Sequence, residues 1–541
     1  MTKPISILNH VLGPIMRGPS SSHSAGSLRI GRLCRDLLGG NVTDIDCDYD
    51  PNGSLATTHL SQGSDLGLTG GLLGWDANDE RLPVYRNHAQ DAGLRFAVHK
   101  IEYGAGHPNT YRLRLGNGDE HHVMTALSLG GGMIEVTDID GMSVSLEGDQ
   151  HVLVAFAVDG SPLGVCCSAQ AFPADAVNDF KAETGAAKVR HLNPVVPVCG
   201  DASTQVPFRN AGEMLIYDGD RNSSLPQLAL EYEAARSGMS HDELRRHVRH
   251  VLATMQESLR IGRAGTSYAD RILPSQVGRY QEANRQGALI GGNAFNEVVV
   301  SVTSVLEAKS AMEVIVAAPT AGSCGVVPGA LLGVGATLDA SEDLLTDALL
   351  TAGLIGVFIA GGATFAAEEG GCMAECGSAS GMSAAALVVM ANGTRQQALA
   401  AASQALQNSF GRTCDTVANR VEAPCLGKNT MAAANAPSSS APTLRSGVLE
   451  VINKIHAAPG INDIVVNLRD DIQSLCNAER ISIFAVDPKT QHLYSIAKAG
   501  NEFKEIRVPK NFGSIVGFTA LSRHTINVKD AHDAAELKQL H

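Results

Sequence analysis

The chain has 541 residues, too many for one ordinary domain, and its length predicts two to four domains. Hydrophobic residues make up 44% of it, enough to bury real cores. The formal net charge of −14 disfavours contact with nucleic acid or anionic lipid, so neither is an expected partner. The opening MTKPISILNH lacks the apolar core of a signal peptide. The 11 cysteines then indicate a reducing cytoplasmic location, where thiols serve metals or catalysis more often than disulfides.

Residues 1–145 predict a mixed α/β (α+β) domain. The apolar runs Phe96–His99 and Tyr111–Leu115 are typical of strands, and Leu28–Leu38 has a helical pattern. A strand-like run, His151–Asp159, opens a small unit at residues 146–205 that ends in a linker punctuated by prolines. Only one or two strands are evident in it, so it resembles at most a small remnant of an ACT module.

Residues 206–440 predict an all-α domain. One helix start is explicit, because Ser240 and Glu243 form a capping box ahead of apolar residues at helical spacing. The apolar run Ala348–Ala367 is nearly long enough to span a bilayer, but its four glycines and charged flanks favour a helix buried in a soluble core. The segment APSSSAP, residues 436–442, predicts a linker.

Residues 459–541 predict a short α/β module. Asn467–Leu475 has a helical pattern, while Arg480–Val486 and Leu493–Ala497 are typical of strands. The expected architecture is therefore multidomain, with an α/β front, an all-α body and a short α/β end.

The spacing of four cysteines suggests a metal site without establishing one. Cys414 precedes Cys425 by eleven residues, Cys372 lies 42 residues upstream of Cys414, and Cys376 follows Cys372 by one helical turn. No CxxC pair recurs, which argues against a zinc ribbon, and thiolates at irregular spacing suit an iron–sulfur cluster better than a hard cation. Buried structural cysteines in a helical core explain the same spacing, and on spacing alone that interpretation is favoured.

Several segments along residues 5–435 have the character of family motifs. They are GPSSSHSAG (18–26), GSLATTHLSQGSD (53–65), HPNT (107–110), SLGGGMIEVTDIDG (128–141), APTAGSCGVVPG (318–329), EEGGCMAECGSASGMSAAA (368–386) and TCD…VEAPC (413–425). Together they resemble the motifs of the bacterial iron–sulfur-dependent L-serine dehydratases. The front of the chain resembles their β part, and the helical body resembles their α part, here fused.

The resemblance implies a [4Fe–4S] cluster on Cys372, Cys414 and Cys425, and L-serine as the substrate. Cys376 and Cys324 fall at positions that are not ligands in the family, so we expect them to be packing residues. With three thiolate ligands, one iron stays open to bind the β-hydroxyl as a Lewis acid, and the products are pyruvate and ammonia. A homodimer is expected.

The Ser-rich loop and a second loop supply candidates for substrate binding and proton transfer. Ser20, Ser21 and Ser22 offer donors to a carboxylate, and His23 is the first candidate for acid–base work. A loop histidine bonded to backbone is the structural alternative for His23.

His107 and Asn109 are second candidates, with a plain turn as the alternative. His59 is weaker, because its Thr-Thr-His run is compatible with an ordinary strand. Asp65 either orients a histidine or caps the following helix, and capping is favoured. A substrate-binding role is assigned to Asn109 and Asp65.

Two substitutions separate this chain from the family pattern. Gln62 replaces a histidine of an HGTD segment and is assigned to substrate binding, because an amide hydrogen-bonds but does not shuttle protons. Lys309 replaces an asparagine before the APT loop and adds a cation that can pair with a carboxylate; we place it with His23 and His107 as a catalytic candidate. These changes leave another β-substituted amino acid open as the substrate.

The family resemblance is expected to fade after about Asn435. Residues 461–533 instead resemble the first half of a GAF domain, in which Cys476 is a remote candidate for a fourth cluster ligand. A catalytically silent sensor or scaffold is therefore the alternative from a different class. A pyridoxal-phosphate lyase is disfavoured, since no lysine has a setting typical of a Schiff base.

Overall fold

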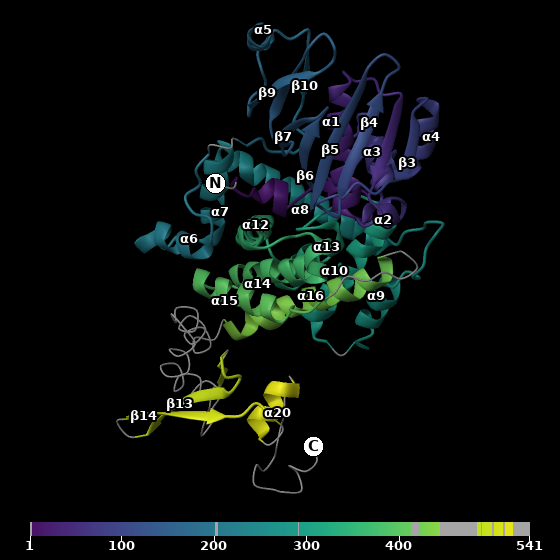
Figure 1. Cartoon of the computed structure of the whole chain (residues 1–541). Coiled ribbons are helices and arrows are strands. Elements are labelled where there is room, and N and C mark those ends of the chain that lie inside the picture. Colours follow the sequence, from purple (N-terminus) through teal and green to yellow (C-terminus); the bar gives the residue numbers. More distant parts are fainter. Residues whose placement is uncertain are drawn as a thin grey trace. The chain divides into compact units, whose positions relative to one another are not determined.

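The computed structural model describes residues 3–200, 204–289, 291–412, 421–443, 484–487, 489–499, 502–511 and 514–522. The chain divides into two compact units, Met1–Ala441 and Pro442–His541. Figure 1 shows the first unit as a β-rich part stacked on a helical part.

The front of the first unit contains a mixed six-stranded sheet in its described residues. Its order is β3-β2-β4-β5-β6-β7, with β2 and β3 parallel and the remaining neighbours antiparallel. The strands predicted at 96–99 and 111–115 are confirmed, and each is slightly longer than expected. The bounds are β2 Asp44–Tyr49, β3 Arg95–Lys100, β4 Thr110–Gly116, β5 His121–Gly130, β6 Met133–Ile139 and β7 Met142–Leu146.

Two helices, α1 (Ser27–Leu37) and α3 (Ser64–Leu72), pack on this sheet and share its core. Where they cross, a Cβ at Gly31 would collide with the Leu68 carbonyl, and one at Gly71 would collide with the Leu28 carbonyl. Only glycine permits this approach, which sets the position of α1 and of the loop before it. The shorter helices α2 (Leu55–Gln62) and α4 (Tyr85–Asp91) lie between β2 and β3 in the sequence, as α3 does.

A second, three-stranded sheet follows, in the order β10-β8-β9. It consists of β8 (His151–Phe156), β9 (Pro162–Ser168) and β10 (Lys188–Leu192), with α5 (Ala174–Thr184) between β9 and β10. The sequence indicated one or two strands here, so the small unit is more complete than expected. The alternation in β9 and β10 is weak because both strands are only half-buried.

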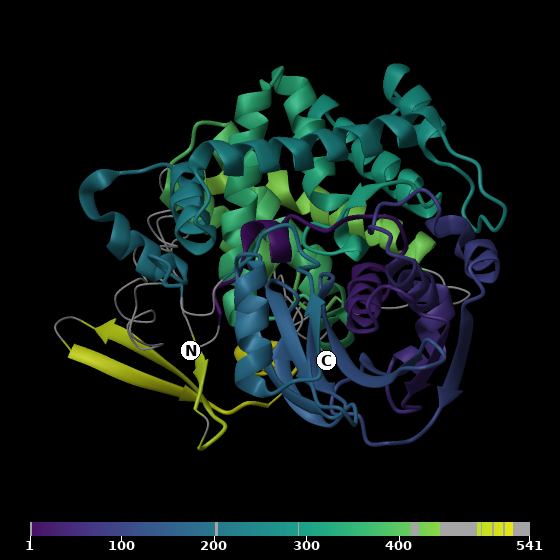
Figure 2. The ribbon, with the colours of Figure 1, turned by 90° about the horizontal axis from the view of Figure 1, so that it is seen from above.

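Most of α12 is buried among the other helices of the helical part. Figure 2 shows the teal and green helices of this part gathered together. The predicted capping box is present, since Ser240 and Glu243 bond reciprocally at the start of α8. The helices are α6 Ala211–Asp218, α7 Leu225–Ser237, α8 His241–Ala264, α9 Val277–Arg285, α10 Asn293–Ser310, α11 Val326–Leu338, α12 Glu342–Gly362, α13 Ala367–Cys372, α14 Ser378–Met390, α15 Arg395–Gln407 and α16 Glu422–Thr443.

The linker predicted at residues 436–442 is wrong, because α16 continues through this segment. Ala436 and Ser440 are buried, and the Ser440 hydroxyl donates to the carbonyl oxygens of Ala384 and Ala436. Small residues let α16 approach α14 closely, and Ser hydroxyls bonded to the preceding turn are compatible with a helix. The composition of this segment is typical of a linker, but its small residues form a close contact between two helices.

The two parts of the first unit are joined by the start of the chain. Strand β1 (Ile15–Met16) pairs antiparallel with β11 (Ile315–Val316) of the helical part. Upstream, Ser6 Oγ and the Ile7 amide donate to the Glu233 carboxylate at 2.7 and 2.8 Å. The start of the chain therefore belongs to both parts, and the segment expected to be all-α contributes one short strand.

Three helical segments are long and apolar enough to cross a membrane by length and composition: Ala321–Leu338, Glu342–Gly362 and Ala367–Met390. Within the fold, 67%, 67% and 83% of their most apolar windows are buried. The second contains most of the run predicted to be a core helix, and it contributes to the hydrophobic core described above.

The described residues of the second unit form a three-stranded antiparallel sheet in the order β12-β13-β14 and one helix. The bounds are β12 Ala485–Val486, β13 Leu493–Ala499, β14 Glu502–Val508 and α20 Ile515–Ser522. The strand predicted at 493–497 is confirmed. The helix predicted at 467–475 and Cys476 lie outside the described residues.

Candidate functional site

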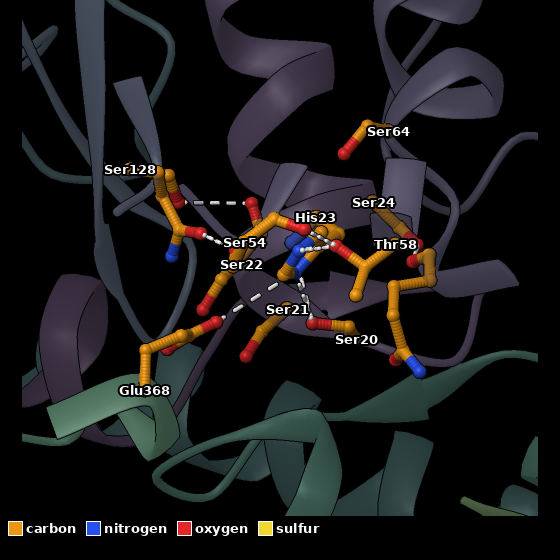
Figure 3. A network of polar contacts seen from close by, with 12 residues as sticks. Ser20, Ser21, Ser22, His23, Ser24, Ser54, Thr58, Ser64, Ser128 and Glu368 are labelled. Carbon is orange, nitrogen blue, oxygen red and sulfur yellow. Dashed lines mark hydrogen bonds and ion pairs between the residues drawn. The ribbon is translucent and has the colours of Figure 1, made fainter. Parts of the chain in front are cut away.

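The Ser-rich loop folds into a buried π-helical turn, Ser21–Gly26, between β1 and α1. Figure 3 shows the His23 ring between Ser20 of its own turn, Thr58 and Glu368. His23 Nδ1 lies 3.2 Å from Ser20 Oγ and 3.9 Å from Glu368 Oε1, and Nε2 lies 3.0 Å from Thr58 Oγ1. His23 is 4% exposed, so water does not stabilise a protonated form of its imidazole.

These contacts indicate which ring nitrogen of the neutral His23 carries the proton. The Thr58 hydroxyl donates its proton to the Ser54 carbonyl at 2.6 Å, so it accepts from His23 Nε2–H. Nδ1 is then the acceptor, on the side of Ser20 and Glu368. Burial lowers the pKa of His23 below its ordinary value of 6.5, and Glu368 opposes this shift. The arrangement favours a neutral base at Nδ1 near neutral pH.

The HPNT segment lies beside this turn. Asn109 is 1% exposed; its Oδ1 accepts a hydrogen bond from Ser54, whereas its buried Nδ2 has no partner among the described residues. His107 Nδ1 accepts a hydrogen bond from the backbone N–H of Asn109. The other ring nitrogen of His107, Nε2, lies 3.9 Å from Glu369 Oε1. The turn expected as the structural alternative is thus present, together with one unsatisfied amide donor and one histidine facing a carboxylate.

Helix α13 connects both histidines with a cysteine. Glu368 faces His23 and Glu369 faces His107 from its first turn, and Cys372 follows a break in the helical backbone at Gly371. Sequence reasoning missed both glutamates, although they begin the EEGGC segment that carries Cys372. Their carboxylates become informative only when the chain folds the two loops against this helix.

Asp65 orients His59 instead of capping a helix. Its Oδ1 lies 2.8 Å from His59 Nδ1, and α3 begins without a side-chain cap. The favoured capping role is therefore wrong, and the strand expected around His59 is helix α2. An Asp hydrogen-bonded to Nδ1 fixes the tautomer with the proton on that nitrogen and leaves Nε2 as the acceptor. Gln62, which ends α2, accepts a hydrogen bond from Ser24 through its backbone carbonyl.

Cys372 and Cys425 are buried, 3% and 8% exposed, whereas Cys414 lies outside the described residues. Across the part of the chain that the structure covers, no three His, Cys, Asp or Glu side chains gather as a metal site. Cys324 and Cys376 are also buried, so burial does not separate them from the expected ligands. Cys376 Sγ lies 3.6 Å from the Asn429 side-chain nitrogen.

The APTAGSCG loop and Glu375 complete the surroundings of these thiols. Thr320 donates to the half-buried Glu375 carboxylate at 2.6 Å, and a Cβ at Gly322 would collide with that carboxylate. Burial raises the pKa of Glu375. The Ala321 amide donates to Ser21 Oγ at 3.2 Å, so this loop also contacts the turn that carries His23.

A cavity of about 280 Å³ opens beside the cysteines and is lined by Lys309, Arg86, Ser61 and Cys425, among others. Lys309 is 6% exposed, and its Nζ has no hydrogen-bond partner within the described ranges. Burial lowers the pKa of Lys309, but the Cys425 sulfur and its neighbours outweigh burial and raise it overall. A buried, charged and unsatisfied ammonium on a cavity wall is a binding group for an anion.

Comparison with known proteins identifies the family of the chain. The family model "Serine dehydratase alpha chain" matches residues 220–473. The expectation that the resemblance ends near Asn435 is therefore wrong, and the match includes the first part of the segment expected to be GAF-like.

Individual relatives match both halves of the chain. The probable L-serine dehydratase alpha chain of Bacillus subtilis is 34% identical over 229 residues, covering 42% of this chain and 76% of that protein. The beta chain from the same organism is 35% identical over 144 residues, 27% of this chain and 64% of its own length. L-serine dehydratase 1 of Escherichia coli is 27% identical over 448 residues, 79% of this chain and 88% of that protein. The chain is thus a lyase that belongs to the L-serine dehydratase family, with α-type and β-type sequence in one polypeptide.

Proposed function

We propose that the chain is a cytoplasmic L-serine ammonia-lyase that converts L-serine to pyruvate and ammonia. The observation that carries the proposal is the segment Ala367–Cys372, in which Glu368 faces His23, Glu369 faces His107, and Cys372 follows the backbone break at Gly371. Acid–base groups and a candidate metal ligand thus meet on one short element. Neither membrane nor nucleic acid is a proposed partner, and the proposed assembly is a homodimer.

The proposed cofactor is a [4Fe–4S] cluster on Cys372, Cys414 and Cys425. The surroundings fit an anionic cluster, because a cationic side chain lies near each of the two described thiols. Lys309 is next to Cys425, and Arg412 is near Cys372; Lys309 Nζ and Arg412 Nη1 lack hydrogen-bond partners among the described residues. When bound, such a cluster supplies a Lewis-acidic iron for the substrate hydroxyl.

The chain's own residues then bind the amino acid and move its α-proton. His23 accepts this proton at Nδ1, while Thr58 holds the opposite ring nitrogen in its N–H form. The substrate carboxylate takes hydrogen bonds from the Ser20–Ser22 turn and from Asn109 Nδ2, the unsatisfied donor.

Four further residues complete this assignment. Lys309 provides a charge-assisted contact, and Gln62 contributes substrate hydrogen bonds. His107 is the second proton-transfer candidate, facing Glu369. Asp65 acts through His59, which makes it a positioning residue.

Lys309 favours one alternative, a lyase for a different β-substituted amino acid. Serine has only one carboxylate, which is already assigned to the Ser20–Ser22 turn and Asn109. A second anionic group on the substrate would satisfy the buried ammonium of Lys309. The GAF-like character of residues 459–541, and with it a silent sensor or scaffold, remains a proposal from sequence resemblance alone.

An amino-acid panel under strictly anaerobic conditions tests the proposal. Full-length, iron-reconstituted protein is assayed for ammonia release from L-serine, L-threonine, L-cysteine and 3-hydroxy-L-aspartate. The proposal expects the highest kcat/KM for L-serine. A higher value for the dicarboxylic substrate supports the alternative, and no turnover of any substrate supports the scaffold.

A further inference from the structure

A second cavity, of about 410 Å³, lies in the first unit and shares no lining residue with the cavity beside Cys425. Its walls come from five segments of the chain. They are the N-terminal stretch 8–15, the start of α1, residues 76–78, the connection 194–197, and α8 between His247 and Val251. Its volume is within the usual range for small-molecule sites, roughly 300–1,000 Å³.

Most of this wall is apolar. Leu8, Leu12, Leu28, Val196 and Val251 are buried in the fold and also line the cavity. Their side chains offer a surface suited to a branched aliphatic group, whose transfer from water is favourable. Apolar walls alone do not specify a ligand, so the polar groups decide its chemistry.

The wall carries a positive charge that no carboxylate neutralises in the described chain. Arg29 is 3% exposed, and its recorded hydrogen bonds all use Nη1, to the Gly132 carbonyl at 2.5 Å and to Met133 Sδ at 3.6 Å. Burial lowers the pKa of Arg29 to about 10, so it stays protonated at neutral pH. The guanidinium keeps unused donors in a site where an unpaired charge is costly.

The remaining charged groups of the lining do not reverse this sign. Arg32 forms an ion pair with Asp76, the acidic residue of the lining. His247 and His250 add imidazoles from α8. Among the described lining residues, Arg29 is thus the arginine that has no carboxylate partner.

We propose that this cavity binds a small amphipathic monocarboxylate, in which a carboxylate adjoins a branched aliphatic group. The carboxylate meets Arg29, and the aliphatic group packs on Leu8, Leu12 and Val251. Arg29 lies in the first turn of α1, which follows directly after the turn that carries His23. A bound ligand therefore also stabilises the segment on which His23 is mounted.

Calorimetric titration of the full-length protein with 4-methylpentanoate tests the proposal, with 4-methylpentanamide as the neutral control of the same shape. The acid is expected to bind at least about tenfold more tightly, the ratio that one charge-assisted hydrogen bond provides. Hydrogen–deuterium exchange should slow in residues 8–32, 194–197 and 247–251. Equal affinity for acid and amide, or protection confined to other segments, overturns the proposal.

Two variants locate the anion. Arg29→Met removes the charge, and His250→Glu places a carboxylate in the cavity wall at an exposed position that does not depend on core packing. Each is expected to weaken 4-methylpentanoate binding at least about tenfold. Arg246→Met on the same helix is the matched control, because Arg246 is exposed and does not line the cavity. If Arg29→Met fails to fold, His250→Glu decides, and unchanged binding in that variant contradicts the site.

Discussion

At the scale of single residues, His23 is held by one hydroxyl on each ring nitrogen, in a setting where water hardly reaches it. Burial and Glu368 shift its pKa in opposite directions, and burial dominates. The histidine therefore stays neutral to lower pH than in water. This matters for catalysis because a base works only in its unprotonated form.

The pH profile of kcat/KM tests this account of His23. The base form persists below pH 6.5, so the acidic limb is expected below the ordinary histidine value. Glu368→Gln removes the group that raises the pKa of His23, and the limb should move to still lower pH. Glu313→Gln, at a surface ion pair with Arg17, is the control and leaves the limb in place. A limb that moves to higher pH in Glu368→Gln contradicts the assignment.

Replacing His23 itself should affect the rate more than binding. His23→Asn is expected to lower kcat by about 10²–10⁴, the usual contribution of a general base, with KM changed little. Thr58→Val removes only the acceptor that fixes the tautomer, so a smaller loss is expected. Steady-state kinetics with L-serine measure both. Full activity of His23→Asn would exclude it as the base.

Lys309 should affect binding more than rate. Lys309→Gln removes a buried charge-assisted contact, and KM for L-serine is expected to rise about 10- to 100-fold. Arg86→Gln changes an exposed cation of the same cavity and should have a much smaller effect. An unchanged KM in Lys309→Gln would show that its ammonium does not contact the substrate.

At the scale of elements, the site depends on how closely α1 and α3 approach one another. Gly31 and Gly71 allow backbone contact at their crossing, and α1 follows directly from the turn that carries His23. A larger side chain at this crossing must separate the helices or distort that turn. The geometry of the site is thus linked to two residues that contact no substrate.

Gly31→Val is expected to destabilise the protein by about 1–3 kcal/mol, as overpacking usually does. Gly278→Ala is the matched control, because a Cβ there meets open space within a helix, and it should be neutral or slightly stabilising. Thermal unfolding followed by circular dichroism compares the two. Equal melting temperatures for Gly31→Val and the parent would contradict the close crossing.

The local elements could largely be predicted from the sequence, because their signals are local. The capping box at Ser240 and the strands near Phe96 and Tyr111 show this. The continuation of α16 could not be predicted, since its helical form depends on contact with α14. Likewise, Glu368 and the orientation of His59 by Asp65 require tertiary contacts that no spacing reveals. The sequence thus predicted which loops form the site, but it did not predict which of their side chains contact one another.

At the scale of the whole molecule, the described candidate groups all belong to the first compact unit, in which β1–β11 pairing joins the sheet part to the helical part. In some relatives these parts are separate alpha and beta chains, as the two Bacillus subtilis matches illustrate. Fusion keeps the His23 turn and α13 in one polypeptide, so their encounter does not depend on subunit concentration.

Deleting residues 484–541 should leave L-serine turnover within about twofold, because none of the described candidate groups lies in that segment. Ammonia release by the shortened and full-length chains, at equal iron content, measures the effect. A shortened chain that folds and retains iron but has lost turnover would show that the second unit contributes to the reaction.

L-serine deamination is expected to depend on a cluster held by Cys372 and its partners. Iron and sulfide are measured after anaerobic reconstitution, together with pyruvate formed from L-serine, in the parent, Cys372→Ala and the exposed-thiol control Cys167→Ala. We predict about four irons per chain, with pyruvate formation, in the parent and the control, and loss of both in Cys372→Ala. A parent that forms pyruvate without iron, or a Cys372→Ala variant that keeps full iron and activity, would contradict this claim.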